Sequence, residues 1–252
     1  MLVSRRLLLS RARMLGLLDE LEMAGSEAWS VYLPSKLLTS EVEDLLKKVS
    51  DIQDIPEDLA GLAASSATGA VILWGSLGRY LVLPPFPIAE KYLTYGYDIE
   101  PLRSLLKHDF SVALVLVRLG AYAIGLCKGD NLIASKVGTG LIHGRHKKGG
   151  SSQQRFQRRR EKQIESFLDR VCSHVQDKLG PQAGTLDYLV YGGSWTAILS
   201  LRKRCSFLQQ FENRILPSLL DIPEPRQAIL EKAADQVWST SVVKWHESRV
   251  LT

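Results

Sequence analysis

The chain of 252 residues is long enough to bury a full hydrophobic core, and its hydrophobic content of 45% and charged content of 23% are ordinary globular values. No stretch approaches the roughly 18 apolar residues that a membrane span requires, so we expect no membrane contact. Arg11 and Arg13 closely follow the short apolar run Leu7–Leu9, a pattern unlike that of a signal peptide. We therefore expect a cytoplasmic protein.

The positive charge of the chain is concentrated in one segment. Eight Lys/Arg and a single acid, Glu161, lie between His143 and Lys162, so this window carries +7 while the whole chain carries +5. The remainder of the chain is therefore slightly negative. A local basic patch on a nearly neutral body indicates contact with a polyanion at one place.

The three cysteines, Cys127, Cys172 and Cys205, are widely separated in the sequence. They form neither a C-x-x-C pair nor a Cys/His cluster with zinc spacing, so we expect no metal and no cofactor. We interpret all three as buried thiols in a reducing compartment.

Residues 1–66 are expected to form an N-terminal helical module. The spacing of Leu7, Met14, Leu18 and Leu21 predicts one helix. A second is predicted from Ser40 to Val49, with Thr39 or Ser40 as its N-cap, and Pro56 should open a third.

Residues 67–252 are expected to form a catalytic domain of the α/β class, in which helices flank a mixed β-sheet. Strand-like periodicity predicts a hairpin over 70–83 and a meander of three strands at 111–117, 121–126 and 132–137. The first strand of the meander is apolar at nearly every position, so it should lie centrally with both faces covered. We also predict helices at 97–107, 155–178 and from Ser194, and a strand at 187–191.

The segment 143–154 is expected to be a poorly ordered loop that carries the chemistry. Its two glycines and two serines give a flexible, narrow backbone, and basic residues flank them on both sides. The tip has no carboxylate or cysteine, and a glutamine amide does not titrate, so it cannot act as a general base. It can place a water and donate hydrogen bonds to a developing oxyanion. This suits ester hydrolysis inside a site that another molecule largely builds.

The pattern Gly149-Gly150-x-x-Gln153, followed by Arg155-Phe156-x-Arg158-x-Arg160-Glu161, resembles the Vms-like release factor family. That family is related to the middle domain of eukaryotic and archaeal class-one release factors. The resemblance implies a release-factor middle-domain-like fold and a ribosome rescue factor that hydrolyses peptidyl-tRNA in the peptidyl-transferase centre. It implies the large ribosomal subunit, rRNA and P-site peptidyl-tRNA as partners. We expect no DNA partner and a monomeric protein.

The resemblance also assigns roles to residues. The displaced motif makes Gln153 the catalytic residue, because Ser151 stands where the strict motif has its glutamine. Gln154 is the alternative, although it directly precedes the expected helix start at Arg155. The catalytic loop comprises Gly149, Gly150, Ser151 and Ser152. The residues expected to bind RNA phosphates are Arg145, Lys147, Lys148, Arg155, Arg158, Arg159 and Lys162.

Other interpretations of this segment stay open. The protein could be an endonuclease that cuts the tRNA 3′ end on stalled ribosomes, or a non-catalytic module that binds rRNA or tRNA. The Gly/Ser/basic segment could also be a solvated linker. The nearby Gly138-Thr-Gly140 does not have the G-x-G-x-x-G spacing of a nucleotide-binding loop.

Overall fold

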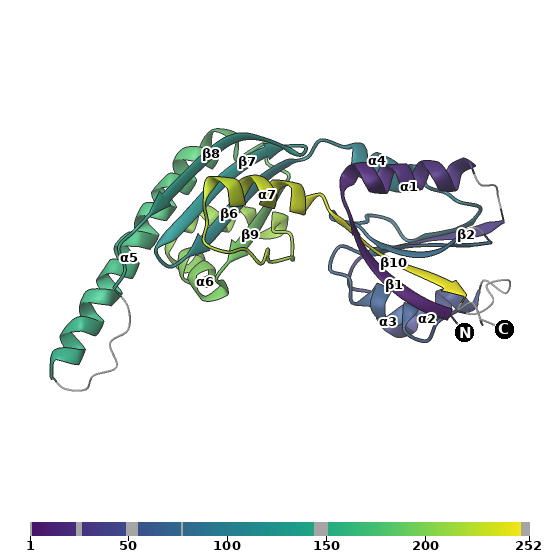
Figure 1. Ribbon diagram of the computed structural model, residues 1–252, viewed down its shortest axis with the longest axis horizontal. Coiled ribbons are helices and arrows are strands. Elements are labelled where there is room, and N and C mark those ends of the chain that lie inside the picture. The colour runs from purple at the N-terminus through teal and green to yellow at the C-terminus, as the bar shows by residue number, and fades with distance from the viewer. Residues whose placement is uncertain (1, 24–26, 49–54, 77, 144–150, 248–252) are drawn as a thin grey trace. The chain divides into compact units, whose positions relative to one another are not determined.

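A computed structural model describes the chain except for residues 1, 24–26, 49–54, 77, 144–150 and 248–252. The chain folds into two compact units (Figure 1). The first comprises Met1–His108 with Gln236–Thr252, and the second comprises Asp109–Asp235. Within the described residues, no helix is both long enough and apolar enough to cross a membrane.

The first unit is built on a six-stranded sheet in which every neighbouring pair is antiparallel. The strands lie in the order β1 (Leu2–Leu9), β10 (Thr240–Glu247), β4 (Gly78–Leu83), β3 (Ala70–Gly75), β2 (Ala28–Leu33) and β5 (Tyr92–Tyr95). Because β10 pairs with both β1 and β4, the end of the described chain completes a sheet that the start of the chain begins.

Helices cover both faces of this sheet. On one face, α1 (Arg11–Met23) and α4 (Glu100–Lys107) pack against a cluster that includes Val71, Leu73 and Val242. On the other face, α2 (Thr39–Lys47) and α3 (Leu59–Ala64) pack against Ile72 and Leu81 (Figure 1). Alternate residues of β3 thus point to opposite cores, as the period of a strand requires.

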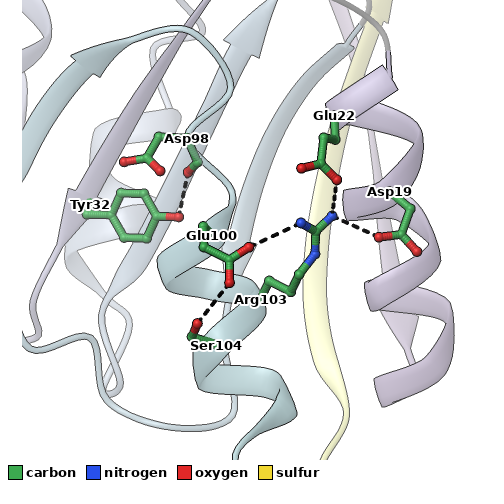
Figure 2. Close-up of polar contacts among 7 residues, drawn as sticks. All are labelled: Asp19, Glu22, Tyr32, Asp98, Glu100, Arg103 and Ser104. Carbon is green, nitrogen blue, oxygen red and sulfur yellow. Dashed lines mark hydrogen bonds and ion pairs between the residues drawn. The ribbon is translucent and has the colours of Figure 1, made fainter.

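Arg103 of α4 connects this helix to α1 (Figure 2). Its guanidinium donates to Asp19 at 2.8 Å and to Glu22 at 2.7 Å, and to Glu100 in its own helix at 3.2 Å. The hydrogen bond from Arg103 lowers the pKa of Glu22 below its usual range. A charge-assisted network of this kind fixes the contact between the two helices more specifically than apolar packing alone.

The prediction of an all-helical N-terminal module was wrong. The helix α1 is confirmed, with Met14, Leu18 and Leu21 buried, and α2 is also present, although Leu38 and not Thr39 or Ser40 is its N-cap. However, residues Leu2–Leu9 and Ala28–Leu33 are strands. The expected boundary after residue 66 would separate β2 from β3, which pair over six residues, so the compact unit extends instead to His108.

The second unit confirms the expected α/β class with a mixed sheet. Its strands lie in the order β8 (Asn131–Thr139), β7 (Ala121–Lys128), β6 (Ser111–Arg118) and β9 (Tyr188–Gly193). The pair β6–β9 is parallel and the other two pairs are antiparallel. As predicted, β6 is central and buried on both faces over Ser111–Val117.

Helices flank this second sheet as well. Two of them, α5 (Ser151–Leu179) and α6 (Trp195–Arg204), cover the face that carries Val115, Ile124 and Tyr191. The opposite face carries Gly125, whose missing side chain leaves room for Leu230 of α7 (Gln227–Val237). Two short 3₁₀ segments complete the unit, Gly180–Gln182 and Ser206–Arg214.

The cysteine prediction was wrong for two of the three residues. Cys172 of α5 and Cys205, which follows the last residue of α6, form a disulfide with a Cα–Cα distance of 5.4 Å. Sequence spacing could not show this pair, because 33 positions separate the two residues and only the packing of α5 against α6 brings them together. Cys127 is a buried free thiol, as expected.

Candidate functional site

The expected catalytic residues lie at the beginning of α5. The helix starts at Ser151 and not at Arg155, so Ser151, Ser152, Gln153 and Gln154 belong to its first turn and the prediction of a loop up to residue 154 was wrong there. Gly149, Gly150, Arg145, Lys147 and Lys148 lie outside the described residues, as does the expected poor order of the loop over 144–150. Gln153 and Gln154 are therefore both helical.

The first turns of α5 extend beyond the β-sheet that the rest of the helix covers (Figure 1). The residues from Gln154 to Arg159 are all exposed, and the first fully buried residue of the helix is Phe167. At a rise of about 1.5 Å per residue, the sixteen steps from Ser151 to Phe167 correspond to about 24 Å of helix. The beginning of α5 is therefore presented to solvent on a rigid element and not on a free linker.

The residue at which the 144–150 segment begins is attached to the side of α5. The backbone N–H of His143 donates to Gln163 Oε1 at 3.2 Å, and Arg160 Nε donates to the carbonyl oxygen of His143 at 3.0 Å. His143 thus lies beside Arg160, nine residues or about 13 Å of helix from Ser151.

Four basic residues of α5 form a stripe on its solvent face. Arg155, Arg158, Arg159 and Lys162 are spaced at i, i+3, i+4 and i+7, which places them on one face of the helix, and all four are exposed. Within the described part of the chain, none of the four has a carboxylate within 4.0 Å.

Three acidic residues of α5 near the stripe, Glu161, Glu165 and Asp169, contact other side chains. Arg204 of α6 donates through Nε and Nη2 to the two carboxylate oxygens of Asp169, both at 2.9 Å, and lies 3.7 Å from Glu165. The hydrogen bond from Arg204 lowers the pKa of Asp169. Glu161 accepts a hydrogen bond from Gln157 at 2.9 Å. These acids are therefore paired elsewhere, and none of them forms an ion pair with the basic stripe among the described residues.

Two glycines before the segment are explained by packing. A Cβ atom on Gly138 would lie 2.3 Å from the hydroxyl of Tyr122, and one on Gly140 would lie 2.6 Å from the ring of Phe167. Both neighbours are buried aromatic residues. The Gly138-Thr-Gly140 motif therefore serves the contact between β7, β8 and α5, as the absence of a nucleotide-loop spacing suggested.

The part of the chain that contains α5 matches a known family. Residues 111–243, more than half of the chain, match the family described as Actinobacteria/chloroflexi VLRF1 release factor. The chain belongs to this family. The match confirms the resemblance to Vms-like release factors that the Gly149-Gly150-x-x-Gln153 pattern indicated, and it includes both this pattern and the whole of α5.

Similarity extends to archaeal class-one release factors. Peptide chain release factor subunit 1 of Aeropyrum pernix is 24% identical over 250 residues, which cover 87% of this chain and 67% of the relative. The protein of the same name from Archaeoglobus fulgidus is 23% identical over 76% of this VLRF1 chain and 54% of the relative. The chain thus spans between about half and two thirds of the length of these relatives.

Two solved structures are also similar to the chain. The crystal structure of the archaeal translation termination factor aRF1 has a TM-score of 0.40 at 20% identity, covering 90% of this chain and 70% of that one. The structure of Archaeoglobus fulgidus Pelota has a TM-score of 0.31 at 7% identity, over 93% of this chain and 62% of that one.

Proposed function

We propose that this VLRF1 release factor acts on the ribosome in the cytoplasm and releases nascent chains from stalled complexes by hydrolysing peptidyl-tRNA. The large subunit, its rRNA and the P-site peptidyl-tRNA are the partners, and the protein acts as a monomer without a cofactor. Membership of a release factor family supports the role in translation. The observation that carries the chemistry is the position of Gln153 in the first turn of a helix whose beginning projects into solvent next to an uncompensated basic stripe.

In the proposed reaction, water attacks the ester carbonyl carbon that joins the peptide to the tRNA ribose. The bond between this carbon and the ribose oxygen breaks, which yields a peptide with a free carboxyl group and a tRNA with a free 3′ hydroxyl. Gln153 accepts a hydrogen bond from the water through its amide oxygen and donates one to the developing oxyanion through its amide nitrogen. Because the amide does not titrate, the proton that the water loses goes to a group of the ribosome or the tRNA.

The basic residues have a separate task in this proposal. Arg155, Arg158, Arg159 and Lys162, together with Arg145, Lys147 and Lys148, hold rRNA or tRNA phosphates on both sides of Gly149 and Gly150. Phosphate contacts supply affinity and register but no chemistry. Ser151 and Ser152 connect the glycines to Gln153. Binding and catalysis should therefore respond to different substitutions.

The experiment is single-turnover release of labelled peptide from large-subunit complexes. Gln153→Ala should slow release by on the order of 10² to 10³, since a few kcal/mol of barrier depend on the positioned water and its hydrogen bonds. Gln157→Ala is the matched control, because it removes an exposed amide one turn later on the same helix. Co-sedimentation of both variants with large subunits should be unchanged.

Three other results would each replace the proposal with a specific alternative. A larger loss for Gln154→Ala than for Gln153→Ala would transfer the catalytic role to the neighbouring amide. A released peptide that still carries nucleotides would identify an endonuclease that cuts the tRNA 3′ end. Full release by Gln153→Ala, combined with loss of function on charge reversal of Arg155 and Arg158, would identify a non-catalytic RNA-binding module.

A further inference from the structure

A shallow hollow of about 280 Å³ lies on the side of α5, beyond the point where His143 is attached. Three cations line it, Arg159, Lys162 and Arg170, together with Leu141 and the edge of Phe167. Arg170 lies outside the basic window that the sequence singled out, because Ile164, Phe167 and Leu168 separate it from the run of charges at 155–162. The hollow therefore extends the basic surface toward the body of the second unit.

The cations of the hollow follow the helical repeat. Residues 159, 162, 166 and 170 are spaced at i, i+3, i+7 and i+11, which places them in one row along α5. At about 1.5 Å per residue this row is about 16 Å long, enough to follow more than one phosphate of a nucleic acid strand. Ser166, the one neutral member of the row, is exposed and adds a hydroxyl donor to it.

The charge in the hollow is not compensated. Glu161, which is adjacent to Lys162, accepts a hydrogen bond from Gln157, while Glu165 and Asp169 are directed to Arg204 of α6. Among the residues that the structure describes, no carboxylate lies within 4.0 Å of Arg159, Lys162 or Arg170. A row of three cations without an acid is the electrostatic signature of an anion-binding surface.

The backbone at the end of β8 sets the position of Arg170. A Cβ atom on Gly140 would lie 2.8 Å from Arg170 Nη2, so the guanidinium rests where a side chain of residue 140 would otherwise stand. Leu141, which follows Gly140 in the sequence, is 78% exposed and forms an apolar wall of the same hollow. Cations beside an exposed apolar side chain match the two parts of a nucleotide, a charged phosphate and a largely apolar ribose or base face.

We propose that this hollow extends the RNA-binding surface of α5 toward the β-sheet, so that Arg170 joins Arg159 and Lys162 in holding backbone phosphates of a single strand while Leu141 contacts a base. The planar guanidinium of Arg170, which lies over Gly140, makes the directional contact, because its fork of N–H donors matches two phosphate oxygens. This proposal rests on the proposed function, because the bound RNA strand is taken to belong to rRNA or tRNA. The extended surface lets α5 bind RNA along its side as well as at its beginning, which fixes the direction in which Gln153 points.

The test measures equilibrium binding of the full chain to a short single-stranded RNA and to large subunits over a series of salt concentrations. Arg170→Gln should weaken binding by about five- to tenfold and reduce the slope of log K against log salt by about 0.7, the value of one phosphate contact on a single strand. Lys178→Gln is the matched control, since it removes one exposed positive charge from the same helix outside the hollow. Its effect should stay below about twofold.

A further variant separates the charge of Arg170 from its geometry. Arg170→Lys should retain the salt slope and lose part of the affinity, because the charge stays and the fork is lost. An Arg170→Gln variant indistinguishable from Lys178→Gln would overturn the proposal, and so would competition by polyglutamate as strong as that by RNA of equal charge, which would indicate an acidic protein partner.

The two proposals can fail independently. Normal release by Gln153→Ala, with weakened RNA binding by Arg170→Gln, would remove the hydrolytic role and leave the RNA site. Slow release by Gln153→Ala, with unchanged binding by Arg170→Gln, would support the hydrolytic role and remove the site.

Discussion

Gly138 of β8 faces Tyr122 of β7 across the sheet, and this pair shows what a single residue contributes to the position of α5. The ring of Tyr122 is buried and stacks on His174, with the ring centroids 5.8 Å apart and the planes at 18°. It also meets Phe167 edge-on at 6.0 Å. His174 and Phe167 both belong to α5, so they leave the Tyr122 ring little freedom to move. Residue 138 of β8 must therefore lack a side chain.

Replacing Gly138 by alanine should therefore destabilise the protein. The new Cβ atom would lie 2.3 Å from the Tyr122 hydroxyl, and overpacking of this kind costs about 1–3 kcal/mol of unfolding free energy. Urea unfolding of Gly138→Ala, compared with Gly184→Ala, measures the effect, because a Cβ on Gly184 meets no atom within 4 Å. Equal stability of the two variants would contradict the packing role.

Sequence patterns alone predicted part of this residue-scale picture. The spacing of Arg155, Arg158, Arg159 and Lys162 was sufficient to place them on one exposed face, because the helical repeat is a local property. The roles of Gly138, Gly140 and Arg170 depend on which element packs against which. No pattern within a single segment carries that information.

At the scale of elements, the periodicity of apolar residues predicted most helices and strands. It failed where a strand pairs with a segment that is distant in the sequence. The strand β10 went unrecognised although it pairs with β1 over eight residues, since the two lie at opposite ends of the chain. Leu7 was assigned to a helix because it continues the helical spacing of α1. In the structure, Leu7–Leu9 are instead part of β1, because they pair with β10. The start of α5 was placed four residues late, because two serines and two glutamines carry no apolar periodicity.

The disulfide between α5 and the end of α6 should contribute to the stability of the second unit. For a loop of 33 residues the entropy of the unfolded chain gives an upper value of about 3–4 kcal/mol. The double variant Cys172→Ala with Cys205→Ala should lose up to this amount in urea unfolding without reductant. Thiol reagents should find one free thiol per chain in the denatured, unreduced protein.

The remaining thiol provides an internal control for that count. Burial raises the pKa of Cys127 to about 12, so in the folded protein near pH 8 it stays protonated and unreactive. The folded chain should therefore show almost no reactive thiol, and the unreduced, denatured chain should show one. Three thiols in the denatured chain would mean that Cys172 and Cys205 are not joined.

At the scale of the whole molecule, the first unit is discontinuous in the sequence. The chain leaves it at His108, forms the second unit, and returns with Gln236–Thr252. A single boundary at residue 66, inferred from a change in periodicity, divides the chain into two continuous segments. It could not represent a unit that contains residues from both ends of the chain. The family match at 111–243 covers nearly all of the second unit and also includes the first residues of β10.

The distribution of charge predicts how the whole molecule should respond to salt. The segment from His143 to Lys162 carries +7 in a chain of net charge +5, so RNA contact through it should displace several counterions. With about six to eight phosphates neutralised, affinity for large subunits should fall by a factor on the order of 10² to 10³ between 50 and 200 mM salt.

The pair Arg155→Gln with Arg158→Gln should reduce the slope of log K against log salt by about 1.4, because two contacts of about 0.7 each are lost. The pair Lys178→Gln with Lys203→Gln removes the same charge from exposed positions away from the stripe and should leave the slope unchanged. Equal slopes for both pairs would mean that net charge alone determines binding, and an affinity that stays flat with salt would mean that the basic segment does not contact RNA.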